Sequence, residues 1–149
     1  MASPSFHEIL RTYFIDSTPH VAECGMRITH LDAAGAEVTL PFRPEWIGDT
    51  ERGLIHPGIV TTLVDSACGA AVMARIERLD PIATLDLRMD YLRAGVGGVD
   101  VHCRAECYRL TSSIAFARAT VWQHQRDEPI AISQSVFMRT QRRTAPGEA

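Results

Sequence analysis

Lysine and asparagine are both absent from this chain of 149 residues, and all 15 of its basic residues are arginine. We interpret the two absences as a bias of genome composition. They have one consequence for function, because a role that other proteins give to asparagine must be taken here by another residue or by none. The formal net charge of −3 also argues against a nucleic-acid-binding protein, which needs a basic face.

Long apolar runs are missing as well, and none approaches the roughly 18 residues of a membrane-spanning helix. The N-terminus lacks the basic stretch and apolar core of a secretory signal. We therefore expect a cytoplasmic protein without membrane partners. Its 46% apolar and 22% charged residues are typical of a soluble globular domain. The length suits a single domain over residues 1–149, with a core over about 20–140.

The common motifs of nucleotide, metal and hydrolase sites are also missing. There is no Walker loop, Gly-x-Gly-x-x-Gly, His-Glu-x-x-His or Gly-x-Ser-x-Gly. The four cysteines include no Cys-x-x-Cys pair, which excludes a zinc ribbon or thioredoxin-like motif in its usual form. We expect reduced thiols that fill small gaps in the core, and neither a metal ion nor a cofactor.

The N-terminal third of the chain shows one helical segment and two extended ones. Ser5 and Glu8 form a capping box before a predicted helix of about 6–15. Strands are predicted over about 21–31 and 35–42.

A long apolar helix is predicted next, over about 57–79, after a loop of residues 43–55. Pro57 suits its first turn, and most of its length is apolar all round, so it should be buried. Four strands follow, whose apolar faces contain Leu85, Leu87, Met89 and Tyr91; Val99, Val101, Cys103 and Cys107; Ala115, Ala117, Ala119 and Val121; and Ile130, Ile132, Val136 and Met138.

This order of elements predicts an α+β fold with one long helix and a largely antiparallel sheet of six strands. One helix cannot cover both faces of such a sheet. The second face or an edge must be covered elsewhere, which favours a homodimer.

Asp65 stands out because it lies inside the apolar helix. A buried carboxylate is costly without partners, so Asp65 is either exposed, bonded to a backbone group, or held in an apolar cleft for catalysis. His56 stands just before the helix and alone would more often be structural. The two residues together favour a functional site.

This segment resembles the signature of hotdog-fold acyl-CoA thioesterases of the phenylacetate-degradation (PaaI-like) family. The signature is His-Gly-Gly followed by an acidic residue seven positions later, and here it stands as His56-Pro57-Gly58 with Asp65 in register. Two further stretches, 83–93 and, more weakly, 106–117, are also similar to the family. The resemblance covers about residues 20–140.

The resemblance implies a long helix wrapped by an antiparallel sheet, in subunits that pair edge to edge and whose dimers commonly form tetramers. The active site would lie between subunits. Asp65 would act as general base or nucleophile, and His56 would help to orient the thioester. Thr84, supplied by the partner subunit, would position the water.

The sequence departs from the family's pattern at Pro57. The glycine that the family carries there donates its N–H to the thioester oxygen, but proline has no N–H. The contact must come from Gly58, Ile59, His56 or a water, or be missing. Thr50 stands where relatives often carry asparagine, and Arg93 is either a candidate for binding CoA phosphates or an ordinary exposed residue at a strand end.

We therefore expect an acyl-CoA thioesterase that hydrolyses an acyl- or aryl-CoA to the free acid and CoA, with the CoA thioester as its substrate and no cofactor. A homodimer is the minimum assembly and a homotetramer is expected. Two alternatives remain open: an acyl-CoA-binding protein without catalysis, which Pro57 would favour, and an enoyl-CoA hydratase or dehydratase on the same fold.

Overall fold

The computed structural model describes residues 3–140. The elements follow in the order α1 (Phe6–Asp16), α2 (Pro19–Glu23), β1 (Arg27–Asp32), β2 (Gly35–Leu40), η1 (Pro44–Trp46), β3 (Ile47–Asp49), β4 (Leu54–Ile55), α3 (Pro57–Ile76), β5 (Ile82–Tyr91), β6 (Val101–Leu110), β7 (Ile114–Trp122) and β8 (Ala131–Arg139).

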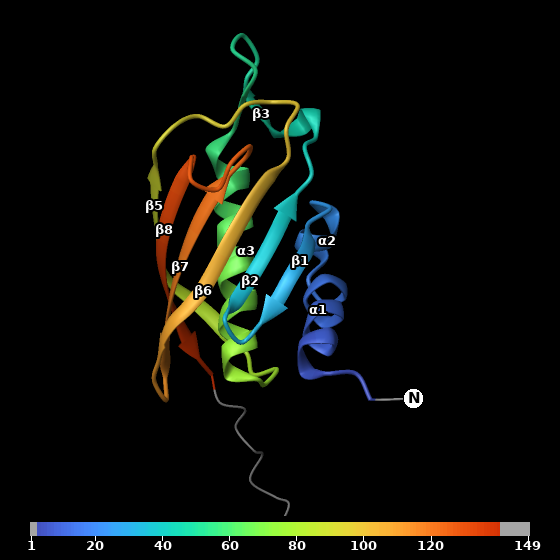
Figure 1. Cartoon of the computed structure of the whole chain (residues 1–149), viewed down its shortest axis with the longest axis vertical. Coiled ribbons are helices and arrows are strands. Elements are labelled where there is room, and N and C mark those ends of the chain that lie inside the picture. Colours follow the sequence, from blue (N-terminus) through green and yellow to red (C-terminus); the bar gives the residue numbers. More distant parts are fainter. Residues whose placement is uncertain (1–2, 141–149) are drawn as a thin grey trace, which may run out of the picture.

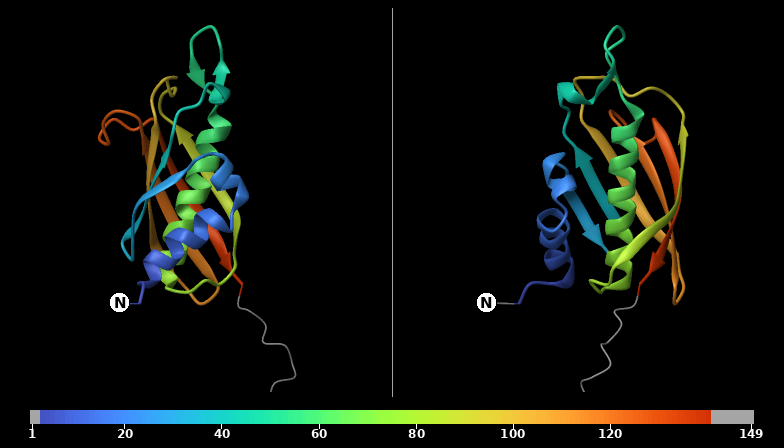
Figure 2. Two further views of the ribbon diagram at one scale, coloured as in Figure 1. Left: turned by 90° about the vertical axis from the view of Figure 1, so that its right-hand side faces the viewer. Right: turned by 180° about the vertical axis from the view of Figure 1, so that it is seen from behind.

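Six strands form one antiparallel sheet in the order β1-β2-β6-β7-β8-β5, and α3 packs along one face of it (Figure 1). Figure 2 shows α1 and α2 beside the β1 edge, with β5 at the opposite edge of the sheet. This is the hotdog arrangement that the sequence predicted. Because β5 is an edge strand, its backbone is open to pairing with another chain.

The predicted capping box is confirmed at the start of α1. The Ser5 hydroxyl accepts from the Glu8 N–H at 3.3 Å, and the Ser5 N–H donates to the Glu8 carboxylate at 2.6 Å. The strand predicted from residue 21 was wrong in its first part, because residues 19–23 form α2. Pro19 ends α1 and also occupies the first turn of α2, where its missing N–H costs nothing.

Residues 43–55 were predicted as a loop, but they contain η1 and a small hairpin of β3 and β4, which stands at the top of Figure 1. The turn is held by Asp49, whose Oδ1 accepts from the backbone N–H of Glu51 and Arg52 at 3.1 and 3.0 Å. The hairpin leads directly into the residue that begins α3.

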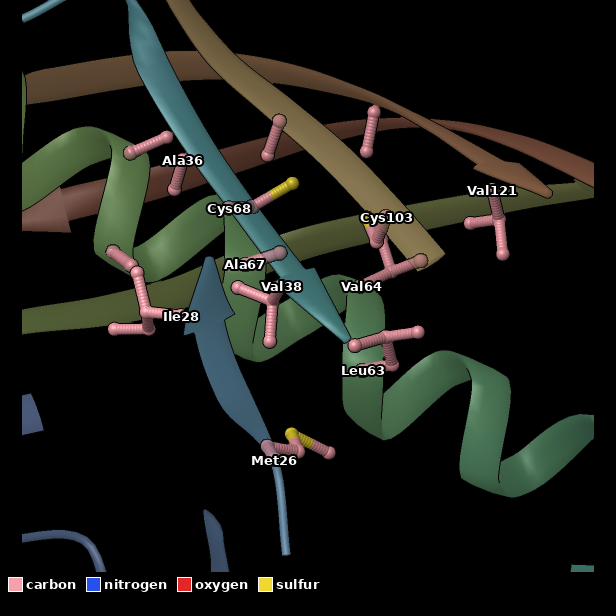
Figure 3. Close-up of a cluster of buried hydrophobic side chains, with 14 of the residues drawn as sticks. Met26, Ile28, Ala36, Val38, Leu63, Val64, Ala67, Cys68, Cys103 and Val121 are labelled. Atoms are coloured by element: carbon pink, nitrogen blue, oxygen red, sulfur yellow. The ribbon is translucent and has the colours of Figure 1, made fainter. Parts of the chain in front are cut away.

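Small side chains let α3 lie close to the sheet. Figure 3 shows Leu63, Val64 and Cys68 of the helix among side chains of β2 and β6. Fully buried alanines occur on both surfaces: Ala67, Ala70 and Ala74 on α3, and Ala105, Ala115, Ala117 and Ala131 on the sheet. Burial raises the pKa of Cys68 to about 12, so its thiol is unreactive and fills space.

In length and composition α3 could cross a membrane, so the expectation that no segment reaches this length was wrong. Most of its apolar stretch is buried within the protein. Its apolar composition is therefore that of a core helix.

The predicted apolar face of β8 was also wrong. Ser133 and Ser135 are buried, whereas Ile132 and Met138 are 41% and 39% exposed on the other face. Successive side chains of a strand point to opposite faces of the sheet, so when one set faces the core the other set faces outward. Here the small serines are buried, and Ile132 and Met138 are left on the outer face of the sheet, where Gln134 and Val136 lie between them.

Candidate active site

His56 is the N-cap of α3 and is held in place by its backbone and by its ring. Its backbone N–H donates to the carbonyl of Trp46 at 2.8 Å, and its Nδ1 accepts from the N–H of Gly58 at 2.9 Å. A Cβ at position 58 would lie only 2.9 Å from Nδ1, so the glycine makes room for the ring. The structure therefore uses the N–H of Gly58 to fix His56.

The end of β5 is tied to the same helical turn. The Tyr91 hydroxyl donates to the carbonyl of Pro57 at 2.9 Å and lies 2.7 Å from the hydroxyl of Thr61. The sequence placed Tyr91 in a stretch that resembles the family but gave it no role. Its hydrogen bonds connect the stretch 83–93 to the segment that begins at His56.

A pocket of about 320 Å³ lies beside this turn. Its walls include Leu54, Ile55, His56, Pro57, Val60 and Tyr91. Asp49 also borders the pocket, and most of its other walls are apolar, as is common for small-molecule sites. The pocket can therefore hold an apolar group next to the imidazole.

Asp65 lies two turns further along α3 and is half-buried. Its Oδ1 accepts a hydrogen bond of 2.7 Å from the hydroxyl of Thr84 on β5. Within residues 3–140 no donor bonds to the other carboxylate oxygen. Asp65 is thus neither bonded to the backbone nor fully exposed. The contact with Thr84 forms within one chain, which corrects the expectation that a partner subunit supplies Thr84.

The pocket around Asp65, of about 410 Å³, has both polar and apolar walls. Thr61, Thr62, Ser66 and Thr84 line it together with Asp65, and Leu87 adds an apolar side chain. Thr18, His20 and Val21, at the start of α2, close another side. The sequence gave no indication of these three residues, because they lie outside the motifs.

His56 and Asp65 do not share a pocket within one chain. They are nine positions apart, which corresponds to about 13 Å along a helix. One carbonyl group cannot contact both. The structure brings His56, Pro57 and Gly58 together at one end, and Asp65 and Thr84 together at the other.

The two remaining candidate residues lie apart from both pockets. Thr50 is exposed at the tip of the β3–β4 hairpin. Arg93 is exposed just after β5 and borders a neighbouring hollow of about 200 Å³ with His124 and Glu128. Within the described part of the chain, no group of three or more His, Cys, Asp or Glu could hold a metal ion.

Proteins of known sequence match this chain over most of its length. The medium/long-chain acyl-CoA thioesterase YigI of Salmonella typhimurium is 25% identical over 139 residues, which cover 84% of this chain and 88% of the relative. The protein of the same name from Escherichia coli K12 is 26% identical over 114 residues, 68% of each chain.

Solved structures agree in fold. A protein of Pseudomonas aeruginosa is 33% identical with a TM-score of 0.80, covering 91% of this chain and 99% of that one. A mutant of the phenylacetic acid degradation protein PaaI from Thermus thermophilus is 28% identical with a TM-score of 0.72, covering 83% and 100%. The profile of the thioesterase superfamily matches residues 52–130, more than half of the sequence. The chain therefore belongs to the thioesterase superfamily.

Proposed function

We propose that this protein is an acyl-CoA thioesterase, which hydrolyses the thioester of an acyl- or aryl-CoA to the free acid and CoA. The observation that carries the proposal is the carboxylate of Asp65, which accepts a hydrogen bond from the Thr84 hydroxyl and belongs to a residue that lines a pocket. Membership of the thioesterase superfamily and the likeness to acyl-CoA thioesterases support it.

In the proposed reaction Asp65 removes a proton from water, and the resulting hydroxide adds to the thioester carbon. Negative charge then develops on the carbonyl oxygen, which lies near the start of α3 of the partner subunit, where the positive end of the helix dipole favours it. Collapse of this intermediate breaks the C–S bond and expels the CoA thiolate, which recovers the proton from Asp65.

We further propose that two copies of the chain complete each site by pairing their β5 strands. If these edge strands pair antiparallel about an axis between Leu87 and Arg88, Thr84 of one copy lies opposite Tyr91 of the other. The Asp65 pocket of one copy then faces the His56 pocket of its partner. Leu85, which is 55% exposed on β5, would be covered by this pairing.

A homodimer is therefore the minimum assembly that we propose. Three apolar side chains that are exposed on the outer face of the sheet, Tyr108, Ile132 and Met138, support a tetramer in which two dimers cover each other's sheets. We propose a cytoplasmic location, no cofactor, and Arg93 as a candidate contact for the phosphates of CoA.

One observation favours a second function, binding of acyl-CoA without turnover. Pro57 has no N–H, and the N–H of Gly58 is bonded to His56, so the usual amide donor is missing. A panel of acyl-CoA esters with a thiol reagent separates the two functions. A thioesterase releases free CoA, whereas a binding protein is stabilised against heat by the esters and releases none.

Thr84 provides a test of how Asp65 is oriented. Thr84→Val keeps the shape of the side chain but removes the hydroxyl, and should lower kcat by about 10-fold to 100-fold, because hydrogen bonds to charged groups contribute about 1.5–3 kcal/mol. Thr84→Ser keeps the hydroxyl and should retain most of the activity. Equal kcat values for the two variants would remove Thr84 from the mechanism.

A further inference from the structure

The backbone at the start of α3 has no free donor for a substrate oxygen. Pro57 has no N–H. The N–H of Gly58 donates to His56 Nδ1 at 2.9 Å, and the N–H of Ile59 donates to the carbonyl of His56 at 3.3 Å. The first three positions of a helix normally offer unpaired N–H groups, but here each is missing or occupied. A donor to the carbonyl oxygen must therefore come from elsewhere.

The same hydrogen bond fixes the tautomer of the neutral His56 ring. A backbone N–H can only donate, so Nδ1 must be the unprotonated nitrogen, and the single ring proton lies on Nε2. Within residues 3–140 Nε2 has no hydrogen-bond partner. The ring is exposed and forms part of the wall of the pocket beside Tyr91.

Packing also fixes the position of the His56 ring. A Cβ at Gly48 would lie 2.8 Å from the Cβ of His56, so the hairpin packs directly against this residue. Together with the contacts to Trp46 and Gly58, this holds the imidazole in one orientation at the positive end of α3. A donor held in place before the reaction is what stabilisation of an oxyanion requires.

We propose that the Nε2–H of His56 donates to the thioester carbonyl oxygen and replaces the backbone amide that Pro57 lacks. This rests on the proposed function and deepens it. His56 then has two separate tasks: Nδ1 caps the helix, and Nε2–H polarises the carbonyl. Proline is tolerated at position 57 because the side chain before it supplies the donor.

Substitution of His56 by asparagine or by glutamine separates these two tasks. The amide of His56→Asn lies where Nδ1 does and can cap Gly58, but it does not reach the position of Nε2. The amide of His56→Gln reaches that position but is a poor cap. We expect His56→Asn to lower kcat by about 10²-fold to 10³-fold, the usual cost of a lost oxyanion donor, and His56→Gln by about 10-fold or less.

Stability should follow the opposite order, with His56→Gln unfolding at a lower denaturant concentration than His56→Asn. If His56 only capped the helix, kcat and stability would rank the two variants in the same order. A kcat of His56→Asn equal to or higher than that of His56→Gln would therefore overturn the inference. A ¹⁵N NMR spectrum of the neutral ring should show the proton on Nε2, and a proton on Nδ1 would also overturn it.

The proposed function is tested separately by the wild-type protein. Wild-type turnover together with equal kcat values for the two His56 variants would overturn the role of Nε2–H alone. Absence of turnover by the wild-type protein would overturn the proposed function, and the inference with it.

Discussion

Replacing Asp65 by asparagine is expected to lower kcat for acyl-CoA hydrolysis by about 10²-fold to 10⁴-fold, which is the usual contribution of a general base. The amide has the same shape as the carboxylate, and its oxygen can still accept the hydrogen bond from the Thr84 hydroxyl. It cannot take a proton from water. The rate of CoA release, followed with a thiol reagent, measures the effect.

The substitution should change stability little, because Asp65 is half-buried and keeps its contact with Thr84. Asp127→Asn is a matched control, since it removes a carboxylate from an exposed turn between β7 and β8. The control should retain the wild-type kcat. Wild-type turnover by the Asp65→Asn variant would exclude this carboxylate from the reaction.

Local patterns of the sequence predicted the elements that depend on nearby residues. The capping box of Ser5 and Glu8 identified α1, and apolar spacing identified α3 and the six strands of the sheet. Pro19 follows the end of α1 and also begins α2, and local sequence does not distinguish these two roles. The β3–β4 hairpin is too short for an alternating pattern to be visible.

The faces of the strands were harder to predict because packing against α3 decides them. On β8 the serines face the helix and Ile132 does not, although hydrophobicity favours the reverse. On β5 the pairing with β8 shifts between Thr84 and Asp86, so the alternation changes face there. Thr84 consequently points to α3, and Leu85 is exposed.

A sequence motif identified residues of the candidate site, but it did not predict their hydrogen bonds. The sequence identified His56 and Asp65 and noted the missing N–H of Pro57. The occupation of the Gly58 N–H depends on the orientation of the His56 ring, which the packing of the β3–β4 hairpin determines. The tertiary fold brings Tyr91 to the pocket beside His56 and His20 to the pocket around Asp65, and no sequence motif predicted either position.

We propose that two copies of the chain build one site, with His56 from one subunit and Asp65 from the other. His56→Asn and Asp65→Asn each impair every site of a homodimer. A hybrid dimer of the two variants contains one site with both residues intact and one with both replaced. The helix places the two residues about 13 Å apart along its axis within a single chain, so neither variant can repair itself.

The measurement is the rate of CoA release from an equimolar mixture of the two variants after their subunits have exchanged. Random exchange makes half of the dimers hybrid, and each hybrid has one intact site of two, so activity should recover to about a quarter of the wild-type value. Each variant taken alone through the same exchange should remain inactive. A mixture no more active than its separate components would contradict a site shared between subunits.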